Sequence, residues 1–168
     1  MRTIIVIAYQ LHYSKGSECA VAWDYVKHLS RDNRLIVLYG SSAGHHDIGN
    51  TADMDEYIKS NPMKNVRFVP VKPSSPSNNW DFSLRGVRNF YKEYRMWHED
   101  VYNVVKNIIT SEHVDIIHFL GPIGFNEPGI LYELPVPYVW GPIGGMRKAP
   151  ISLLLASDRR YGTGGAKS

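Results

Sequence analysis

Five short apolar runs alternate with amphipathic stretches along this chain, and this alternation limits its fold more than any other feature. Each run is rich in β-branched residues and too short for a surface helix, which is typical of strands buried on both faces of a parallel sheet. We expect the strands at 3–9, 34–39, 66–71, 115–120 and 137–140. We expect helices at 18–30, 53–59 and 84–111, with a short one within 125–134. The pattern predicts an α/β fold, a Rossmann-like parallel sheet with helices on both faces.

Size and composition narrow the class of protein further. A chain of 168 residues with 43% hydrophobic content can form one packed domain, expected over 1–150, with 151–168 as a tail or the start of a further element. The net charge of +3 is too weak to indicate a nucleic-acid partner. The single cysteine, Cys19, excludes an internal disulfide, and no apolar run approaches the roughly 20 residues of a membrane-spanning helix. We therefore expect a cytoplasmic protein, with any membrane contact peripheral.

The last two expected strands each end in a Gly/Pro turn, and the first of them contains His118. Ligands of open α/β sheets bind outside the carboxyl ends of the strands, so the position of this histidine is informative. It either faces a ligand or is a core histidine that hydrogen-bonds to a neighbouring backbone carbonyl. The turns can hold a polyhydroxylated or phosphorylated ligand through backbone N–H groups and a few side chains. The expected ligand contacts here are Gly121, Phe125, Asn126, Gly141, Gly144 and Gly145.

The loop between the first expected strand and helix is a second candidate contact. Gly16, Ser17 and Glu18 lie at the start of that helix, where free N–H groups can bind an anion. A loop with one glycine matches neither the GxGxxG dinucleotide fingerprint nor a P-loop, so the sequence gives little support to NAD or ATP as a ligand.

The longest expected helix carries a basic ridge. Its members are spaced at i, i+3, i+7 and i+10, and they are Arg85, Arg88, Lys92 and Arg95. With neighbouring aromatic residues, such a ridge suits an anionic membrane surface or a lipid phosphate. The alternative is an ordinary solvated helix face, since Glu93, Glu99 and Asp100 dilute the charge.

Other chemistries find little support in the sequence. His45, His46 and Asp47 are adjacent residues of a polar loop and are not expected to converge on one metal ion, so no metal site is predicted. There is no GxSxG elbow, and Cys19 falls on the apolar face of its helix, where a thiol is usually inert.

Three stretches together resemble a known family. They are the loop KGSE before a helix with Trp23, the strand end DIIHF, and above all PVPYVWGPIGG. The chain is similar to the amino-terminal half of GT-B glycosyltransferases of family 4, the group 1 transferases of bacterial polysaccharide and lipopolysaccharide assembly. The resemblance implies two Rossmann-like domains that face a cleft, with the acceptor bound by the amino-terminal domain and the nucleotide sugar by the carboxy-terminal one. It also implies transfer with retention and no obligatory metal.

By this resemblance, Gly16, Ser17 and Glu18 line the cleft and His118 is the catalytic residue that faces the reacting sugar. The carboxy-terminal donor domain is not in the chain, so we expect an acceptor-binding domain that is inactive alone. Its expected partners are a sugar or lipid-linked sugar acceptor, an anionic membrane surface on the inner face of the cytoplasmic membrane, and the missing donor domain. A nucleotide-sugar donor is expected in the complete enzyme, with no other cofactor and no nucleic acid. The alternatives are a non-catalytic sugar-binding or interaction module derived from a half-transferase, and a nucleotide-binding α/β enzyme outside the transferases.

Overall fold

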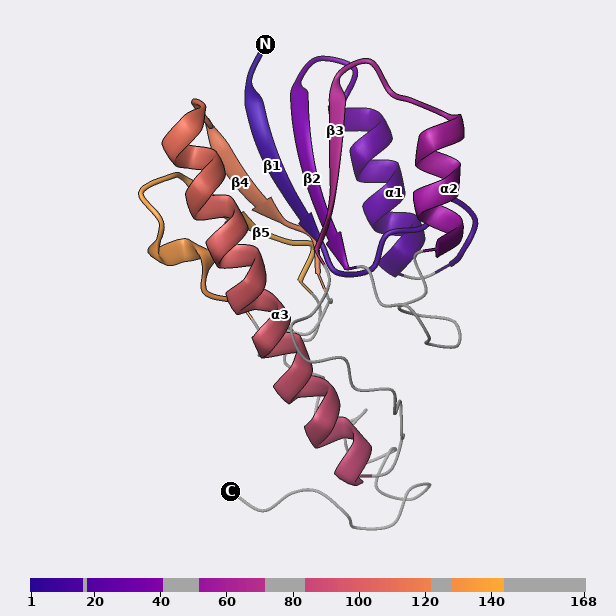
Figure 1. Ribbon diagram of the computed structural model, residues 1–168, viewed down its shortest axis with the longest axis vertical. Coiled ribbons are helices and arrows are strands. Elements are labelled where there is room, and N and C mark those ends of the chain that lie inside the picture. The colour runs from indigo at the N-terminus through magenta and orange to yellow at the C-terminus, as the bar shows by residue number, and fades with distance from the viewer. Residues whose placement is uncertain (17, 41–51, 72–83, 122–127, 144–168) are drawn as a thin grey trace, which may run out of the picture.

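The fold is built on one five-stranded parallel sheet with the order β3-β2-β1-β4-β5 (Figure 1). In a computed structural model, residues 1–16, 18–40, 52–71, 84–121 and 128–143 are described, although the side chains of residues 52 and 84–93 are not. The strands are β1 (Thr3–Ala8), β2 (Arg34–Gly40), β3 (Val66–Val71), β4 (Ile116–Phe119) and β5 (Tyr138–Trp140). The predicted α/β class and all five predicted strands are confirmed.

Three helices join the strands, again where the sequence predicts them. They are α1 (Glu18–Leu29), α2 (Ala52–Ser60) and α3 (Leu84–Ser111). The short helix expected within 125–134 is a single 3-10 turn, η1 (Leu131–Glu133). This segment holds Pro128 and Gly129 just before the turn, and both residues work against a longer helix.

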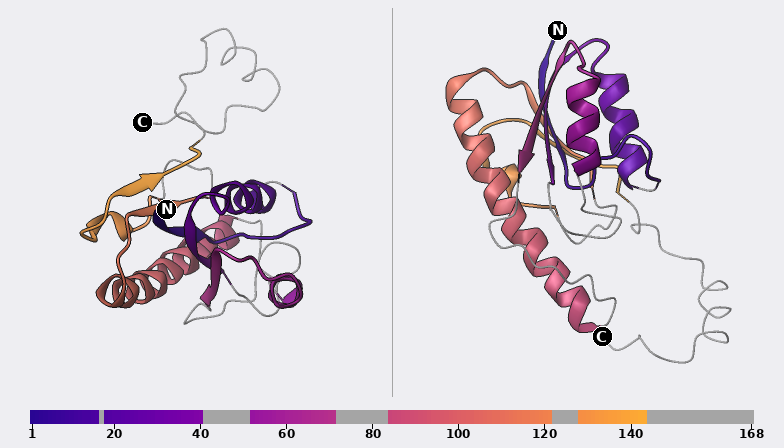
Figure 2. Two further views of the ribbon diagram at one scale, coloured as in Figure 1. Left: turned by 90° about the horizontal axis from the view of Figure 1, so that it is seen from above. Right: turned by 45° about the vertical axis from the view of Figure 1, so that its right-hand side comes forward.

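The helices cover both faces of the sheet, and Figure 2 shows α1 and α3 on opposite sides of it. On one face, Ala22, Trp23 and Val26 of α1 pack against alternate strand residues such as Val6 and Val37. On the other, α3 packs against the intervening residues of the same strands, such as Ile5 and Ile36. Because successive strand residues point to opposite faces, β1 and β2 are buried almost throughout, as the apolar runs predict.

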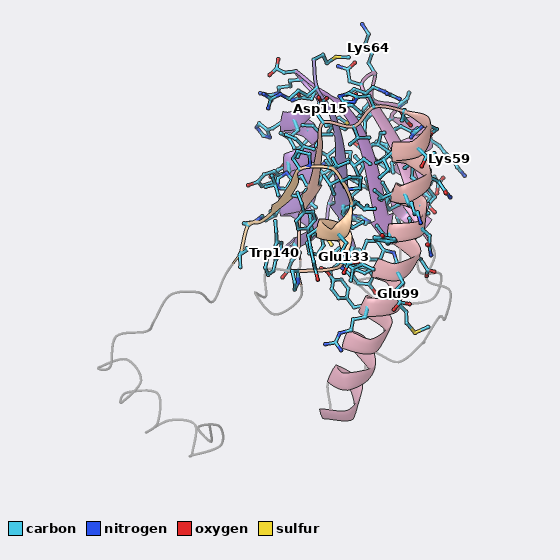
Figure 3. The ribbon with its side chains drawn as sticks, turned by 90° about the vertical axis from the view of Figure 1, so that its left-hand side faces the viewer. Lys59, Lys64, Glu99, Asp115, Glu133 and Trp140 are labelled. Carbon is cyan, nitrogen blue, oxygen red and sulfur yellow. The ribbon has the colours of Figure 1, made fainter. Side chains whose placement is uncertain are left out.

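Only part of α3 packs on the sheet. Its core residues are Tyr94, Trp97, Val101, Val105 and Ile108, which recur at helical spacing. The half that begins at Leu84 extends past the carboxyl ends of the strands (Figure 1, the right panel of Figure 2, and Figure 3).

The amino edge of the sheet is closed by polar contacts. Glu112, just after α3, accepts hydrogen bonds from Arg34 of β2 at 2.6 Å and from Arg67 of β3 at 2.5 Å. Both contacts lower the pKa of the Glu112 carboxyl, against the opposing effect of desolvation. Asp115 accepts the backbone N–H of Thr3 at 2.7 Å. These contacts tie the end of α3 and the start of β4 to the first residues of β1, β2 and β3.

Helix α3 itself contains a buried histidine, His98, which the sequence pattern did not single out. His98 is 2% exposed, and its ring packs edge-on against Tyr94, Trp97 and Phe119 and lies beside Gly129. Neither ring nitrogen has a hydrogen-bond partner among the described residues. Burial lowers the pKa of His98 to about 4, because a charged ring would lose its hydration there.

No helix in the described part of the chain has the length and apolar character needed to cross a bilayer.

Acid should destabilise the fold through His98. Below pH 6.5, the pKa of the unfolded state, the histidine of the unfolded chain is protonated while the buried ring of the folded protein stays neutral. The free energy of unfolding should therefore fall by up to roughly 3 kcal/mol as the pH drops to about 4. His98→Leu should remove most of this loss and leave stability at neutral pH equal or higher, because two unpaired ring nitrogens are replaced by apolar atoms. Urea unfolding at neutral pH and at about pH 5 measures both effects.

The control is His113→Gln, since the side chain of His113 is 85% exposed and lies at the opposite edge of the sheet. If the free energy of unfolding falls equally between neutral pH and about pH 5 in His98→Leu and in the unsubstituted protein, His98 is not the source of the acid destabilisation.

Candidate functional site at the carboxyl edge of the sheet

The carboxyl ends of the strands meet at one edge, opposite the amino edge with its Glu112 contacts (Figure 1). Strand β1 lies at the centre, with β2 on one side and β4 on the other. The loop from β1 to α1 leaves from this edge, as do the turns after β4 and β5. Since all strands are parallel, the residues just after them form one rim, and ligands of open α/β sheets bind at such a rim.

His118 is the third residue of β4 and lies near this edge. Its register partners are Val6 of β1 and Val139 of β5, so it shares the face of the sheet that α1 covers. The ring is partly buried, and its Nε2 atom lies 3.1 Å from the carbonyl oxygen of Gly141. A carbonyl only accepts, so Nε2 is the protonated nitrogen and donates this bond. In the neutral ring Nδ1 is then the acceptor nitrogen.

This hydrogen bond is the backbone contact expected of a core histidine, and it joins strand β4 to the Gly/Pro turn after β5. Gly141, the first residue after β5, also donates its N–H to the carbonyl of Phe119 at 3.0 Å. Burial lowers the pKa of His118, and the bond to Gly141 offsets part of that shift. His118 is therefore held neutral near pH 7.

The two turn glycines adopt backbone conformations that other residues rarely take. Gly121 has φ of 134° and Gly141 has φ of 157°. A side chain at either position would strain the backbone, so both glycines are needed for the turns themselves. The turn after β4 is also held from α3, because the Tyr94 hydroxyl donates to the carbonyl of Gly121 at 3.0 Å. Gly121 and Gly141 thus have a structural purpose, and their predicted ligand contacts stay a prediction.

Two exposed side chains border His118, and sequence reasoning had not assigned either of them to the site. The ring of Tyr25, on α1, meets the imidazole edge-on with centroids 5.5 Å apart. Tyr25 is 38% exposed and Val139 is 46% exposed. We call these three residues, Tyr25, His118 and Val139, the rim patch. Tyr25 could have been found from its position on α1, since it falls three residues after Ala22 and four before Leu29 on the apolar stripe.

The loop between β1 and α1 lies at the carboxyl edge, on the same face of the sheet as the rim patch. Glu18 begins α1 at the carboxyl edge, about 10 Å along the helix axis from Tyr25. A side chain added at Gly16 would meet no atom within 4 Å, so nothing in the described structure crowds this position. The structure thus brings His118, Gly16 and Glu18 to one side of the sheet, along one rim.

A second histidine in this loop also escaped sequence reasoning. His12 is 4% exposed, and its Nδ1 accepts the backbone N–H of Ser14 at 3.1 Å. Its Nε2 is then the protonated nitrogen, and it has no partner among the described residues. Burial is the main cause that lowers the pKa of His12, and nearby Lys15 adds to it. The only signal in the sequence was its place four residues past the buried strand β1.

Most of the other predicted site residues, or their side chains, lie outside the part of the chain that the structure describes. Ser17, Phe125, Asn126, Gly144 and Gly145 lie outside the described residues, as do His45, His46 and Asp47. The basic ridge lies in α3, where Arg95 is exposed and the side chains of Arg85, Arg88 and Lys92 are not described. Among the described residues, no group of three or more His, Cys, Asp or Glu side chains could hold a metal ion.

The thiol of Cys19 is buried on α1, where the sequence placed it. Burial raises its pKa, so little thiolate forms near neutral pH. The predicted burial of this residue is confirmed.

Comparison of the chain with models of known protein families, with curated proteins and with solved structures finds no match. The likeness to a family stated above therefore rests on the residues that carry it, and the site must be argued from its own geometry.

The bond between His118 and Gly141 gives a direct prediction. His118 should be the Nε2-protonated tautomer near pH 7, and nitrogen NMR of labelled histidine measures this. His118→Ala should lower the free energy of unfolding by about 1 kcal/mol, the usual net value of one hydrogen bond. An Nδ1-protonated ring, or an imidazolium at neutral pH, would contradict the assigned bond.

Proposed function

We propose that this chain is the acceptor-binding domain of a sugar-nucleotide-dependent glycosyltransferase of the GT-B type. In the proposal it binds a sugar or lipid-linked sugar acceptor at the carboxyl edge of its sheet. A separate donor domain would supply the nucleotide sugar, and transfer would proceed with retention in the assembly of a bacterial polysaccharide or lipopolysaccharide. The chain alone would bind without transferring, because the groups that stabilise the leaving nucleotide belong to the donor domain.

The observation that carries the proposal is the rim patch. It combines an exposed tyrosine ring, a neutral imidazole and an exposed valine at the strand ends. A sugar offers C–H groups that pack on an aromatic ring and hydroxyls that need hydrogen-bond partners. Tyr25 and Val139 suit the first need, and the acceptor nitrogen of His118 suits the second.

The hydrogen bond to Gly141 decides which atom of His118 could take part in chemistry. Nε2 is occupied as a donor, so a hydroxyl of the acceptor would bond to Nδ1. A neutral ring near pH 7 can accept such a proton, which is the protonation state that a general base requires. His118 would thus orient the acceptor and support its deprotonation.

A non-catalytic sugar-binding or interaction module is the second candidate, and one observation favours it. The ring of His118 already has a structural task, because it holds the turn after β5 through Gly141. Both candidates predict sugar binding at the rim patch. They differ once a donor domain is joined to the chain: His118→Ala should then lower turnover far more than stability in the transferase, and should leave turnover unchanged if the histidine is only structural.

Saccharide binding by the chain itself tests the proposal. We expect millimolar binding of short oligosaccharides and sugar phosphates, followed by NMR shifts of Tyr25 and His118, as is usual for small ligands on an open surface. Tyr25→Ala should weaken it about tenfold by removing the stacking ring. Free nucleoside diphosphates should bind more weakly than the saccharides, since the proposal leaves nucleotide recognition to the donor domain.

The matched control is Tyr132→Ala, because Tyr132 is also an exposed tyrosine, 55% accessible, but lies on η1 beside Tyr138, which packs with the core on the α3 side of the sheet. If Tyr25→Ala and Tyr132→Ala weaken saccharide binding equally, the saccharide site is not the rim patch. Tight binding of a nucleoside diphosphate would instead support a nucleotide-binding enzyme outside the transferases.

A further inference from the structure

The positive charge of this chain is concentrated in one short segment. Residues 84–95 hold four basic residues and one acidic residue, a balance of +3 that equals the formal net charge of the whole chain. The remaining residues hold 15 basic and 15 acidic side chains, because the chain has 19 and 16 in total. Outside this segment the protein is therefore neutral overall.

The same segment is the part of α3 that projects beyond the sheet. Among the α3 residues whose side chains are described, the core begins at Tyr94, and the helix continues back to Leu84 past the ends of the strands (Figure 1). It projects at the carboxyl edge, the edge that carries the rim patch and the loop before α1. The charged segment and the candidate acceptor site thus lie at the same end of the molecule.

Helical spacing sorts the residues of this segment into two neighbouring arcs. Arg85, Arg88, Lys92 and Arg95 fall within roughly 80° of arc at 3.6 residues per turn. Val87 and Phe90 fall on the arc that continues the packed stripe of Tyr94 and Trp97, and Leu84 and Tyr91 fall between the two arcs. An apolar arc beside a basic one is the pattern of helices that lie in the headgroup layer of an anionic membrane.

We propose that residues 84–95 of α3 dock on an anionic lipid surface and hold the carboxyl edge of the sheet toward it. Charge complementarity identifies the occupant. The segment is basic, and an anionic leaflet attracts each Lys or Arg near its surface. The apolar arc favours a lipid interface over a nucleic acid, whose backbone offers charge without an apolar layer. A second copy is disfavoured, because it would bring two segments of charge +3 together.

This orientation would place the rim patch where a lipid-linked saccharide could reach it from the membrane. The inference deepens the proposed function by naming the source of the acceptor, but its first test involves no sugar. Failure of membrane docking and failure of saccharide binding are therefore separate outcomes.

Co-sedimentation with vesicles of phosphatidylglycerol and phosphatidylcholine at low salt tests the inference. Arg88→Gln/Lys92→Gln should lower the membrane partition coefficient, obtained from the fraction bound over a lipid titration, about 25-fold, since each neutralised residue costs about fivefold. Glutamine is a good helix former, so α3 should be retained. Arg88→Lys/Lys92→Arg should restore binding, and the unsubstituted chain should bind far less to vesicles of phosphatidylcholine alone.

The matched control removes the same net charge elsewhere. Lys59 and Lys64 are exposed and lie toward the amino edge of the sheet (Figure 3), so Lys59→Gln/Lys64→Gln should change binding less than twofold. Equal losses from the two double variants would overturn the inference, because only net charge would then matter. Absence of vesicle binding by the unsubstituted chain, or binding to duplex DNA in its place, would overturn it as well.

Discussion

The pairing of β1 with two neighbours at once is the constraint on which the rest of the structure depends. Every residue of the strand pairs with β2, and Ile4 to Ile7 also pair with β4. Ile5, Val6 and Ile7 have no exposed surface. A strand paired on both sides and covered on both faces cannot shift by one residue without moving its apolar side chains to the wrong layer. Its register therefore sets which residues of β2 and β4 reach each edge of the sheet.

The two edges that follow from this register differ in their chemistry. At the amino edge, Glu112 and Asp115 have their oxygen atoms engaged by Arg34, Arg67 and the backbone of Thr3. At the carboxyl edge, His12 keeps a buried ring nitrogen without a partner among the described residues. Polar groups at the first edge are spent on stability, because they hold elements together. At the second edge, the hydrogen bonds of His118 and Tyr94 to Gly141 and Gly121 hold the turns, and one buried nitrogen of His12 is left without such a bond among the described residues.

Much of this arrangement could be predicted because it depends on local pattern. The strands, the helices and the buried face of α1 with Cys19 follow from apolar periodicity, and the conformations of Gly121 and Gly141 follow from Gly/Pro turns at strand ends. The place of His118 near the carboxyl edge could be predicted as well. Contacts between distant segments could not, and Tyr25 and Val139 were missed beside His118 because they are 93 residues before it and 21 after it in the printed sequence.

The sequence by itself determined the class of fold, the order of its elements and the concentration of charge in residues 84–95, because these are properties of neighbouring residues. Only the tertiary structure decided that His118 bonds to Gly141, that His98 and His12 are buried, and that the charged half of α3 projects past the edge that holds the rim patch. The reason is physical: burial and hydrogen bonding between segments depend on how strands pair and helices pack, and a pattern of residue types does not record either.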